Sequence, residues 1–410
     1  MFKRRYARLW LSAAVIVVAP ALADAATLTA SSCSLAAVQA VVDSAANGDV
    51  VQVPAGACTW SSALVVSKSI TLQGAGIDQT TITSASSGQV TLASSADNVR
   101  ITAFTFAGGA TLQVSGGVDW RVHHMKFVGP SFFEGVQIRG DSKTTLPRGL
   151  VDHCTFVNGR VLVMGYPGVG PSETYGATHW TQPLDLGTDK AVYVEDSTFT
   201  LTVFGNAMDC NYSGQYVFRH NTVTDAYIEA HSLQGYDRAC RKWEIYDNTI
   251  RQSTQVVYRP FFIRGGTGVI FNNTVTGTFG TTTIHFDSYR SYADAGAPVG
   301  RCNGASTWDG NAQPNGYPCR DQIGRSTDAY AWTAEPYPSQ TLDPAYVWNN
   351  TMNGSLMSAE VVNSSAGWVQ ANRDFYANVG PKPGYTPYTY PHPLVTLTAP
   401  APPANVIIKK

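Results

Sequence analysis

A motif of about eight residues recurs along this 410-residue chain and restricts its fold more than any other feature. Each copy joins an aromatic or β-branched strand to a short polar turn and one final apolar residue. Most copies follow the previous one after 21 to 29 residues, the length that one turn of a β-solenoid uses. The chain is therefore predicted to be all-β, a single-stranded right-handed parallel β-helix of about ten coils. The final apolar residues are Phe106, Phe127, Phe156, Phe199, Val223, Ile250, Val275 and Met352.

Parallel coils bring equivalent positions of successive turns above one another, so like residues should stack. The six final residues from Phe127 to Val275 are expected to form a column inside the coil. Asn221, Asn248 and Asn273 recur at one place of the motif, each followed by Thr. Stacked amides bond along a solenoid axis, so we interpret this column as structural.

The first residues are basic, then apolar, then small, as in a secretory signal with a cleavage site. We expect a signal peptide over 1–25, the β-helix over 26–395 and a flexible tail over 396–410. A helix near residues 35–45 should cap the first coil, with insertion loops at about 165–190 and 288–345. A Pro-rich segment at 381–394 is expected to act as a strap or C-terminal cap.

Charged residues make up 14% of the chain and the net charge is −1, so no basic field is present to hold nucleic acid. After the signal, no segment is long enough to cross a bilayer. The expected product is a secreted monomer, extracellular or periplasmic.

All seven cysteines follow the signal, so at least one is unpaired. Export favours disulfides over metal binding. We predict bonds between Cys33 and Cys58 and between Cys302 and Cys319. Cys210 and Cys240 lie about one coil apart and could meet by stacking. Cys154 is expected to be the free thiol.

A second strand follows the motif in each coil and usually ends at glycine. Counting back from those glycines gives two adjacent columns on one outward face, since side chains two apart share a face of a strand. This face collects several ionisable groups in a weakly charged protein, which makes it the best candidate site. The columns are Arg139, Met164, Ser213, Gln234, Arg264 and Asp287, and Gln137, Leu162, Asn211, Ser232, Phe262 and His285.

The candidate residues divide by chemistry into three groups. Arginine can neutralise a substrate carboxylate, histidine can abstract a proton and tyrosine can donate one. Carboxylates suit calcium, and flat rings and amides suit sugars. A salt bridge between Arg264 and Asp287 would be the structural alternative. The catalytic candidates are Arg264, His231, Arg259 and Tyr258; the substrate-binding candidates are Asn211, Gln234, His285, Trp180 and Trp308; the candidate ligands of Ca²⁺ are Glu229, Asp209 and Asp287.

The helix followed by GDVVQVPAG, together with the coil repeats, resembles the pectate-lyase-like superfamily of parallel β-helices over residues 33–355. Residues 262–275, FIRGGTGVIFNNTV, are loosely similar to a segment of the chondroitinase B and alginate lyase group. The resemblance implies activity on acidic polysaccharides and a catalytic role for Arg264. That group has a lysine in the preceding coil, where this chain has Ser232 and Gln234.

For β-elimination on a uronate, a site must neutralise the carboxylate, remove a proton and protonate the leaving oxygen. An arginine base would cost on the order of 8 kcal/mol near neutral pH, whereas histidine avoids most of that penalty. The predicted roles are Arg264 as neutraliser, assisted by Arg259 or Ca²⁺, His231 as base, and Tyr258 or Tyr236 as proton donor.

Two other functions remain open from the sequence. A hydrolase of polygalacturonase type needs paired carboxylates, for which Asp209 with Asp237 or Asp287 are candidates. A non-catalytic carbohydrate-binding or adhesive solenoid would use its loop aromatics alone.

Overall fold

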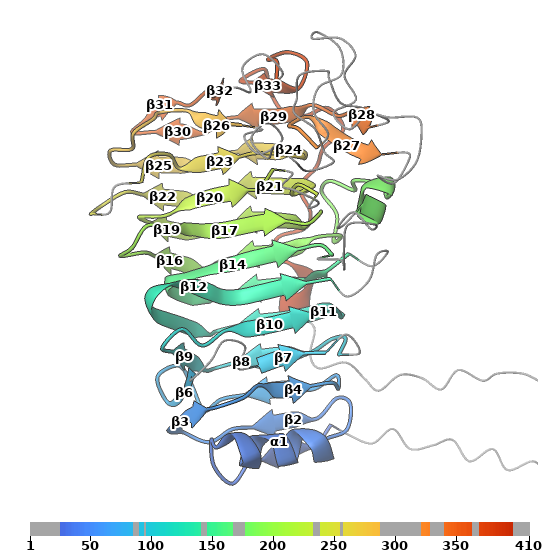
Figure 1. The fold of residues 1–410 in the computed structure, drawn as a ribbon, viewed down its shortest axis with the longest axis vertical. Coiled ribbons are helices and arrows are strands. Elements are labelled where there is room, and N and C mark those ends of the chain that lie inside the picture. The colour runs from blue at the N-terminus through green and yellow to red at the C-terminus, as the bar shows by residue number, and fades with distance from the viewer. Residues whose placement is uncertain are drawn as a thin grey trace, which may run out of the picture.

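In the computed structural model the chain is a parallel β-solenoid of about nine turns, as the repeat predicted (Figure 1). The solenoid is a column with its N-terminal helix at one end and the last strands at the other. Among the residues that the structure describes, no helix is long and apolar enough to cross a membrane. The described residues are 25–84, 90–93, 96–140, 146–166, 177–232, 238–254, 257–287, 321–328, 340–362 and 369–396.

Three stacks of parallel strands form the walls of the solenoid, one strand per turn in each. The first stack is a sheet of twelve strands. Its members are β1 (Thr27–Thr29), β2 (Val50–Gln52), β5 (Thr71–Gln73), β8 (Arg100–Thr102), β11 (Val118–His123), β13 (Arg148–Asp152), β15 (Val192–Glu195), β18 (Gln215–Arg219), β21 (Lys242–Tyr246), β24 (Thr267–Phe271), β29 (Ala345–Trp348) and β33 (Phe375–Ala377).

The second and third stacks are joined because β12 and β14 are long enough to take part in both. The second stack contains β3 (Gly56–Trp60), β6 (Thr80–Ser84), β9 (Thr105–Ala107), the starts of β12 (Lys126–Arg139) and β14 (Thr155–Met164), β16 (Thr198–Thr200), β19 (Thr222–Thr224), β22 (Thr249–Arg251), β25 (Thr274–Thr276) and β30 (Thr351–Met352), with β31 (Ser355–Leu356) antiparallel to β30. The third contains β4 (Leu64–Val66), β7 (Val90–Leu92), β10 (Leu112–Ser115), the ends of β12 and β14, β17 (Asn206–Asn211), β20 (Tyr227–Ala230), β23 (Phe261–Ile263), β26 (Ile284–Phe286) and β32 (Ala359–Val361).

Outside the stacks, β27 (Arg325–Asp328) and β28 (Gln340–Leu342) pair antiparallel. Two short 3-10 helices, η1 (Ala177–Thr181) and η3 (Pro393–Val395), lie in the loops. The predicted signal and tail, and most of the expected loop at 288–345, lie outside the described residues.

The predicted apolar column is confirmed in register and in burial. Phe127 pairs with Phe156, Phe156 with Phe199, and the column continues through Val223, Ile250 and Val275. All six side chains are fully buried. The rings of Phe156 and Phe199 stack with centroids 4.5 Å apart. Because burial of each such side chain contributes roughly 1.5–3 kcal/mol, this column holds the turns together.

The asparagine column is confirmed as a buried ladder of amides. Asn248 Nδ2 donates to Asn273 Oδ1 at 2.9 Å, and Asn221 Nδ2 donates to Asn248 Oδ1 at 3.2 Å. Asn350 continues the ladder one turn further, accepting from Asn273 Nδ2 at 2.7 Å. The threonines that follow lie on the surface and take no part in the ladder.

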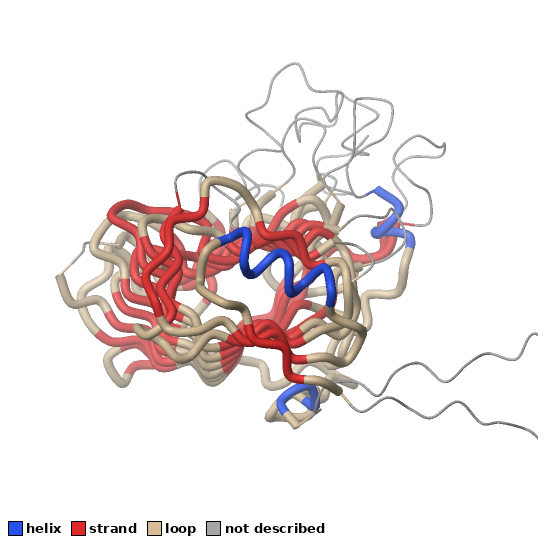
Figure 2. The backbone as a smooth tube through the Cα atoms, turned by 90° about the horizontal axis from the view of Figure 1, so that it is seen from below, coloured by secondary structure: helices blue, strands red, loops and turns tan. Residues whose placement is uncertain are grey.

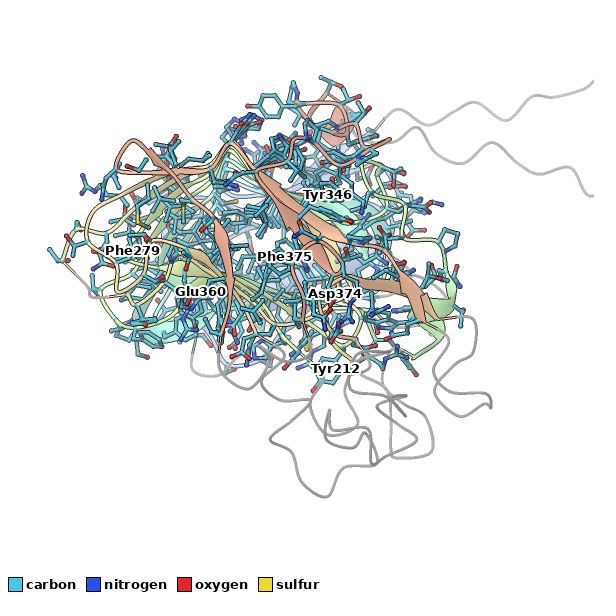
Figure 3. The ribbon with its side chains drawn as sticks, turned by 90° about the horizontal axis from the view of Figure 1, so that it is seen from above. Tyr212, Phe279, Tyr346, Glu360, Asp374 and Phe375 are labelled. Carbon is cyan, nitrogen blue, oxygen red and sulfur yellow. A yellow bond between two sulfur atoms is a disulfide. The ribbon has the colours of Figure 1, made fainter. Side chains whose placement is uncertain are left out.

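Both ends of the solenoid are covered by the chain itself. At the N-terminal end, α1 (Leu35–Ser44) lies across the first turn (Figure 2), with Ser34 as its N-cap and Val38 and Val42 buried. At the other end, Phe375 lies over the centre of the last turn (Figure 3) and is 4% exposed. Its ring packs edge-on against Phe286. Apolar side chains of the terminal turns are thereby removed from water.

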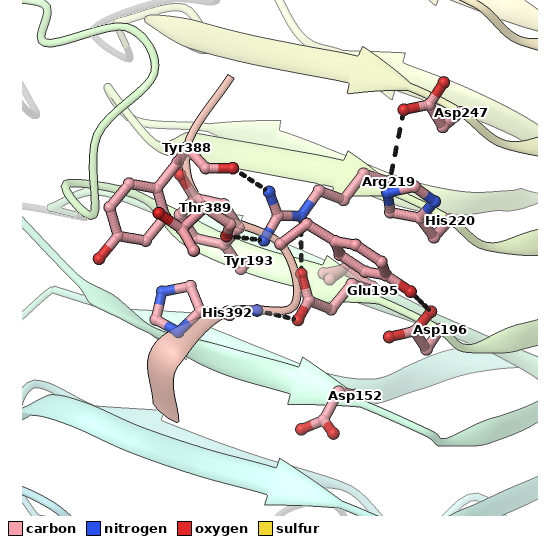
Figure 4. A network of polar contacts seen from close by, with 12 residues as sticks. Asp152, Tyr193, Glu195, Asp196, Arg219, His220, Asp247, Tyr388, Thr389 and His392 are labelled. Carbon is pink, nitrogen blue, oxygen red and sulfur yellow. Dashed lines mark hydrogen bonds and ion pairs between the residues drawn. The ribbon is translucent and has the colours of Figure 1, made fainter. Parts of the chain in front are cut away.

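The Pro-rich C-terminal segment is a strap along the outer face of the first sheet (Figure 4). Arg219, fully buried, pairs with Glu195 at 2.7 Å and donates to the backbone oxygens of Tyr388 and Thr389 at 2.7 and 2.8 Å. The strap also covers a second apolar cluster that lies outside the coil. This cluster contains Leu150, Tyr193, Val217, Tyr246, Val269, Phe271, Trp348 and Leu394.

Two disulfides are present among the described residues. Cys33–Cys58 confirms the prediction, and Cys210–Cys240 joins neighbouring turns as their spacing allowed. Cys154 is buried and free, as expected. Cys302 and Cys319 lie outside the described residues.

Candidate active site

The third stack positions the ionisable residues, but with a register that differs from the sequence prediction. Leu162 pairs with Asp209, not with Asn211, and Phe262 pairs with Glu229, not with Ser232. The prediction for these two turns was wrong because it counted back from glycines. In the structure β17 ends at Asn211, and a left-handed turn precedes Gly214.

That turn is made by Tyr212 and Ser213, with φ angles of 50° and 65°. Ser213 therefore does not share the column of Arg264. The column that contains Arg264 receives His231 from the preceding turn, because the N–H of Arg264 donates to the carbonyl of Ala230 at 2.8 Å. Gln234 lies outside the described residues.

Asp209 and His231 form the central pair of the site. His231 follows directly after β20, and its Nδ1 lies 2.5 Å from Asp209 Oδ1. Asp209 is 1% exposed, whereas the side chain of His231 is 17% exposed. An ionised carboxylate only accepts, so this contact places a proton on Nδ1 and leaves Nε2 of the neutral ring as a base.

The carboxylate of Asp209 is ionised in spite of its burial. Burial by itself would raise its pKa, but His231, Arg160 and Arg264 together lower the pKa below its usual range. Arg160 contacts the other carboxylate oxygen, since its Nη1 lies 2.7 Å from Asp209 Oδ2. Arg160 also pairs with Glu134 on β12 at 2.8 Å.

Glu229 and Arg264 form a second buried pair on the next turns. Arg264 Nη2 donates to Glu229 Oε1, and Asn206 Nδ2 donates to Glu229 Oε2 at 2.5 Å. Both charged side chains are about 5% exposed. Glu229 Oε1 lies 3.9 Å from His231 Nδ1, so the two pairs are one connected cluster.

A third group extends the site towards the C-terminal end of the solenoid. Arg259 Nη1 lies 3.3 Å from His285 Nδ1, and its guanidinium stacks 3.9 Å above the ring of Phe262. Burial, then the charge of Arg259, lowers the pKa of His285, so this histidine is neutral. Its other ring nitrogen faces Glu360 at 3.7 Å. Tyr258 is 54% exposed beside Arg259.

Asp209, Glu229 and His231 could hold a metal ion, since each offers a ligand atom within 4.8 Å of the others. Asp287, predicted as a third acidic ligand, is fully buried and not part of this group. Calcium takes six to eight oxygen ligands, whereas this set includes an imidazole nitrogen. Arg160 and Arg264 already balance the two carboxylates, so the residues present do not fit Ca²⁺.

The predicted substrate-binding residues are scattered. His285 and Asn211 lie on the third stack, near the cluster, and Oδ1 of Asn211 is buried without a hydrogen-bond partner among the described residues. Trp180 is fully buried on η1, with the guanidinium of Arg238 4.6 Å from its ring, and has no surface to offer a sugar. Trp308, and Tyr236 as an alternative donor, lie outside the described residues.

The sequence prediction missed Arg160, Glu134 and Asn206. Arg160 and Glu134 are paired in register on β14 and β12, and Asn206 begins β17. All three lie earlier in their strands than the two columns that were counted back from the glycines. Opposite charges at equivalent positions of consecutive coils were the available signal.

No protein-family model matches this sequence, and no curated protein matches it. Four chains of solved structures match. One is the catalytic domain of a GH87 α-1,3-glucanase in complex with tetrasaccharides, with 9% identity and a TM-score of 0.27. The match covers 89% of this chain and 70% of the glucanase chain. Similarity of this degree does not relate one site to the other.

Proposed function

We propose that this protein is a secreted enzyme that cleaves an acidic, uronate-containing polysaccharide by β-elimination, with His231 as the base. The observation that carries the proposal is the short contact between buried Asp209 and partly exposed His231. A buried carboxylate that holds Nδ1 of a histidine orients the ring and fixes its tautomer. Nε2 then takes a proton from a substrate on the face of the third stack.

In the reaction, His231 removes the proton next to the uronate carboxyl group, and the bond to the leaving oxygen breaks as a double bond forms. The leaving oxygen takes a proton from Tyr258 or from the imidazolium of His231. The developing negative charge on the carboxyl group needs a fixed cation. The disulfides support an oxidising compartment for this chemistry.

Arg259 is better suited than Arg264 to meet that carboxyl group. Arg264 is already paired with Glu229 and is 5% exposed. No described carboxylate lies within ion-pairing distance of Arg259, whose close polar partner is the neutral ring of His285. We therefore assign two roles: Arg264 holds Glu229 in place, and Arg259 neutralises the carboxylate of the substrate.

Hydrolysis by two carboxylates is less well supported. That reaction needs one carboxyl group that is protonated and able to donate. Burial raises the pKa of Asp209, but His231 and two arginines lower it by more, so this carboxyl group is not a proton donor. Asp237 lies outside the described residues, and Asp287 is fully buried.

The test compares His231→Ala with His124→Ala, an exposed histidine in the turn after β11, on pectate, alginate, glucuronan and chondroitin. Release of unsaturated uronate is followed by ultraviolet absorbance. His231→Ala should lower kcat by about 10²–10⁴-fold, the usual range for a general base, and His124→Ala should leave it unchanged. New reducing ends without absorbance would indicate a hydrolase, and binding without cleavage would indicate an adhesive solenoid; either contradicts the proposal.

Asp209→Asn tests the positioning of the base. It removes the charge but not the shape, so kcat should fall while KM changes little. A normal kcat in Asp209→Asn would contradict the role of Asp209.

A further inference from the structure

An open aromatic hollow lies beside the proposed catalytic cluster. It has a volume of about 80 Å³ and is lined by Phe204, Tyr227, Val257, Tyr258, Arg259 and Phe262. Phe204 is 62% exposed and Tyr258 is 54% exposed, which is unusual for large rings that could pack elsewhere. The volume corresponds to about three water molecules, so the hollow receives one face of a ligand and does not enclose it.

Aromatic rings line most of the hollow. Phe204 and Tyr227 lie with centroids 5.7 Å apart and planes inclined by 37°. Phe262 carries the guanidinium of Arg259 on its ring at 3.9 Å and that of Arg264 at 4.9 Å. Flat apolar faces next to a guanidinium suit a sugar ring that bears a carboxylate.

Among the described residues Arg259 forms no ion pair; burial lowers its pKa, and the carboxylates of Asp287 and Glu229 raise it only from a longer distance. Its neighbour His285 is a neutral acceptor, and among the described residues its remaining close contacts are the rings of Tyr258 and Phe262. A guanidinium whose closest partners are a neutral acceptor and aromatic rings can still form an ion pair with a ligand. The ligand that this arrangement favours is therefore an anion with an apolar face.

The hollow adjoins the catalytic cluster through two contacts. Phe262 pairs in register with Glu229, and burial followed by the charge of the Glu229 carboxylate raises the pKa of Tyr227. Glu229 in turn lies 3.9 Å from the ring of His231. A uronate seated in the hollow, with its carboxylate on Arg259, would thus present the proton next to that carboxylate to His231.

We propose that the hollow is a sugar-binding subsite for one uronate residue, stacked on Phe204 and Tyr258 and paired through its carboxylate with Arg259. The proposal rests on the proposed function for the placement of the scissile bond, but the binding does not require cleavage. The occupant is a segment of an acidic oligosaccharide, and a neutral one lacks the partner for Arg259.

The test measures binding by titration calorimetry in the His231→Ala background, which prevents turnover. The probes are tetramers of galacturonate, mannuronate, guluronate and glucuronate, with cellotetraose as the neutral comparison. Phe204→Ala and Tyr258→Ala should each weaken the best uronide about two- to tenfold, the range for one aromatic contact. Arg259→Gln should weaken it tenfold or more and abolish the preference over cellotetraose. Tyr376→Ala is the matched control, because it removes an aromatic ring from β33 of the first sheet, and it should leave binding unchanged.

Two results would overturn the subsite: no uronide binds at millimolar concentration, or the three variants bind like the control. The outcome is separable from the proposed function. Uronide binding that depends on these residues, without elimination by the wild type, would refute the lyase and keep the subsite. Elimination by the wild type with unchanged kcat/KM in Phe204→Ala would refute the subsite alone, because Phe204 has no role in the proposed chemistry.

Discussion

Removing one amide side chain from the asparagine ladder should lower the free energy of unfolding far more than removing the side chain of its exposed neighbour. Asn248 accepts from the buried N–H of Asn221 at 2.9 Å and donates to the backbone oxygens of Phe218 and Tyr246 at 2.9 and 3.0 Å. Asn248→Ala therefore leaves a buried amide without its acceptor, at about 1–3 kcal/mol, and forfeits donor bonds of about 1 kcal/mol each. We expect a total loss of about 2–5 kcal/mol in the free energy of unfolding.

Thr249→Ala is the matched control, because Thr249 belongs to the same turn but is exposed. It should cost no more than about 0.5 kcal/mol. Urea unfolding followed by circular dichroism measures both variants. Asn248 and Asn273 bond directly, so the double variant should show a coupling of about 0.5–3 kcal/mol. Asn248→Ala within 1 kcal/mol of the wild type, or strict additivity, would refute the account of the ladder.

Two further predictions concern the core and the strap. Ile250→Asp should abolish soluble expression, because it puts a carboxylate without a partner into a fully buried column; recovery of soluble, folded protein would contradict the register. Burial, followed by the charge of Arg219, lowers the pKa of His392 to about 4. The unfolded ring titrates near 6.5, so stability should be unaffected above pH 6.5 and fall by up to about 3 kcal/mol as the pH drops to 4. In His392→Gln the unfolding midpoint should depend less on pH across this interval. A pH dependence equal to that of the wild type would contradict the lowered pKa of His392.

The sequence was sufficient for the fold because its signals are local and repeated. Phe156 and Ile250 each end a copy of the same motif, and parallel stacking converts that spacing directly into three-dimensional register. The asparagine ladder follows from the same geometry, which also allowed the pair Cys210–Cys240. Here one rule, applied once per turn, determines many contacts.

The site was less predictable because it depends on where each strand of the third stack ends. A turn of two left-handed residues after Asn211 shifts Asp209 into the column that Asn211 was expected to occupy. Glycine count does not reveal such a turn, since Tyr212 and Ser213 adopt it without glycine. The result is that His231 and Arg264 lie in one cluster, with Asp209 and Glu229 as their respective partners in place of the residues that the columns predicted.

Arg160 shows a second reason why sequence reasoning was incomplete. It lies 49 positions before Asp209, with an insertion between them, so spacing alone does not bring them together. Their contact exists because β14 passes directly beside β17. Contacts across an insertion require the three-dimensional path of the chain.

The strap has a consequence for how the molecule folds. In a solenoid each turn contacts only its neighbours, so the ends can loosen independently of the middle. The strap breaks this rule, since Arg121 donates to the carbonyl of Val395 at 3.0 Å across 274 positions of sequence, and Lys382 pairs with Asp343 near the opposite end. It is also the last described segment to be synthesised, so it can dock only on turns that have already formed. Its docking therefore ties early and late turns into one cooperative unit and marks the completion of the fold.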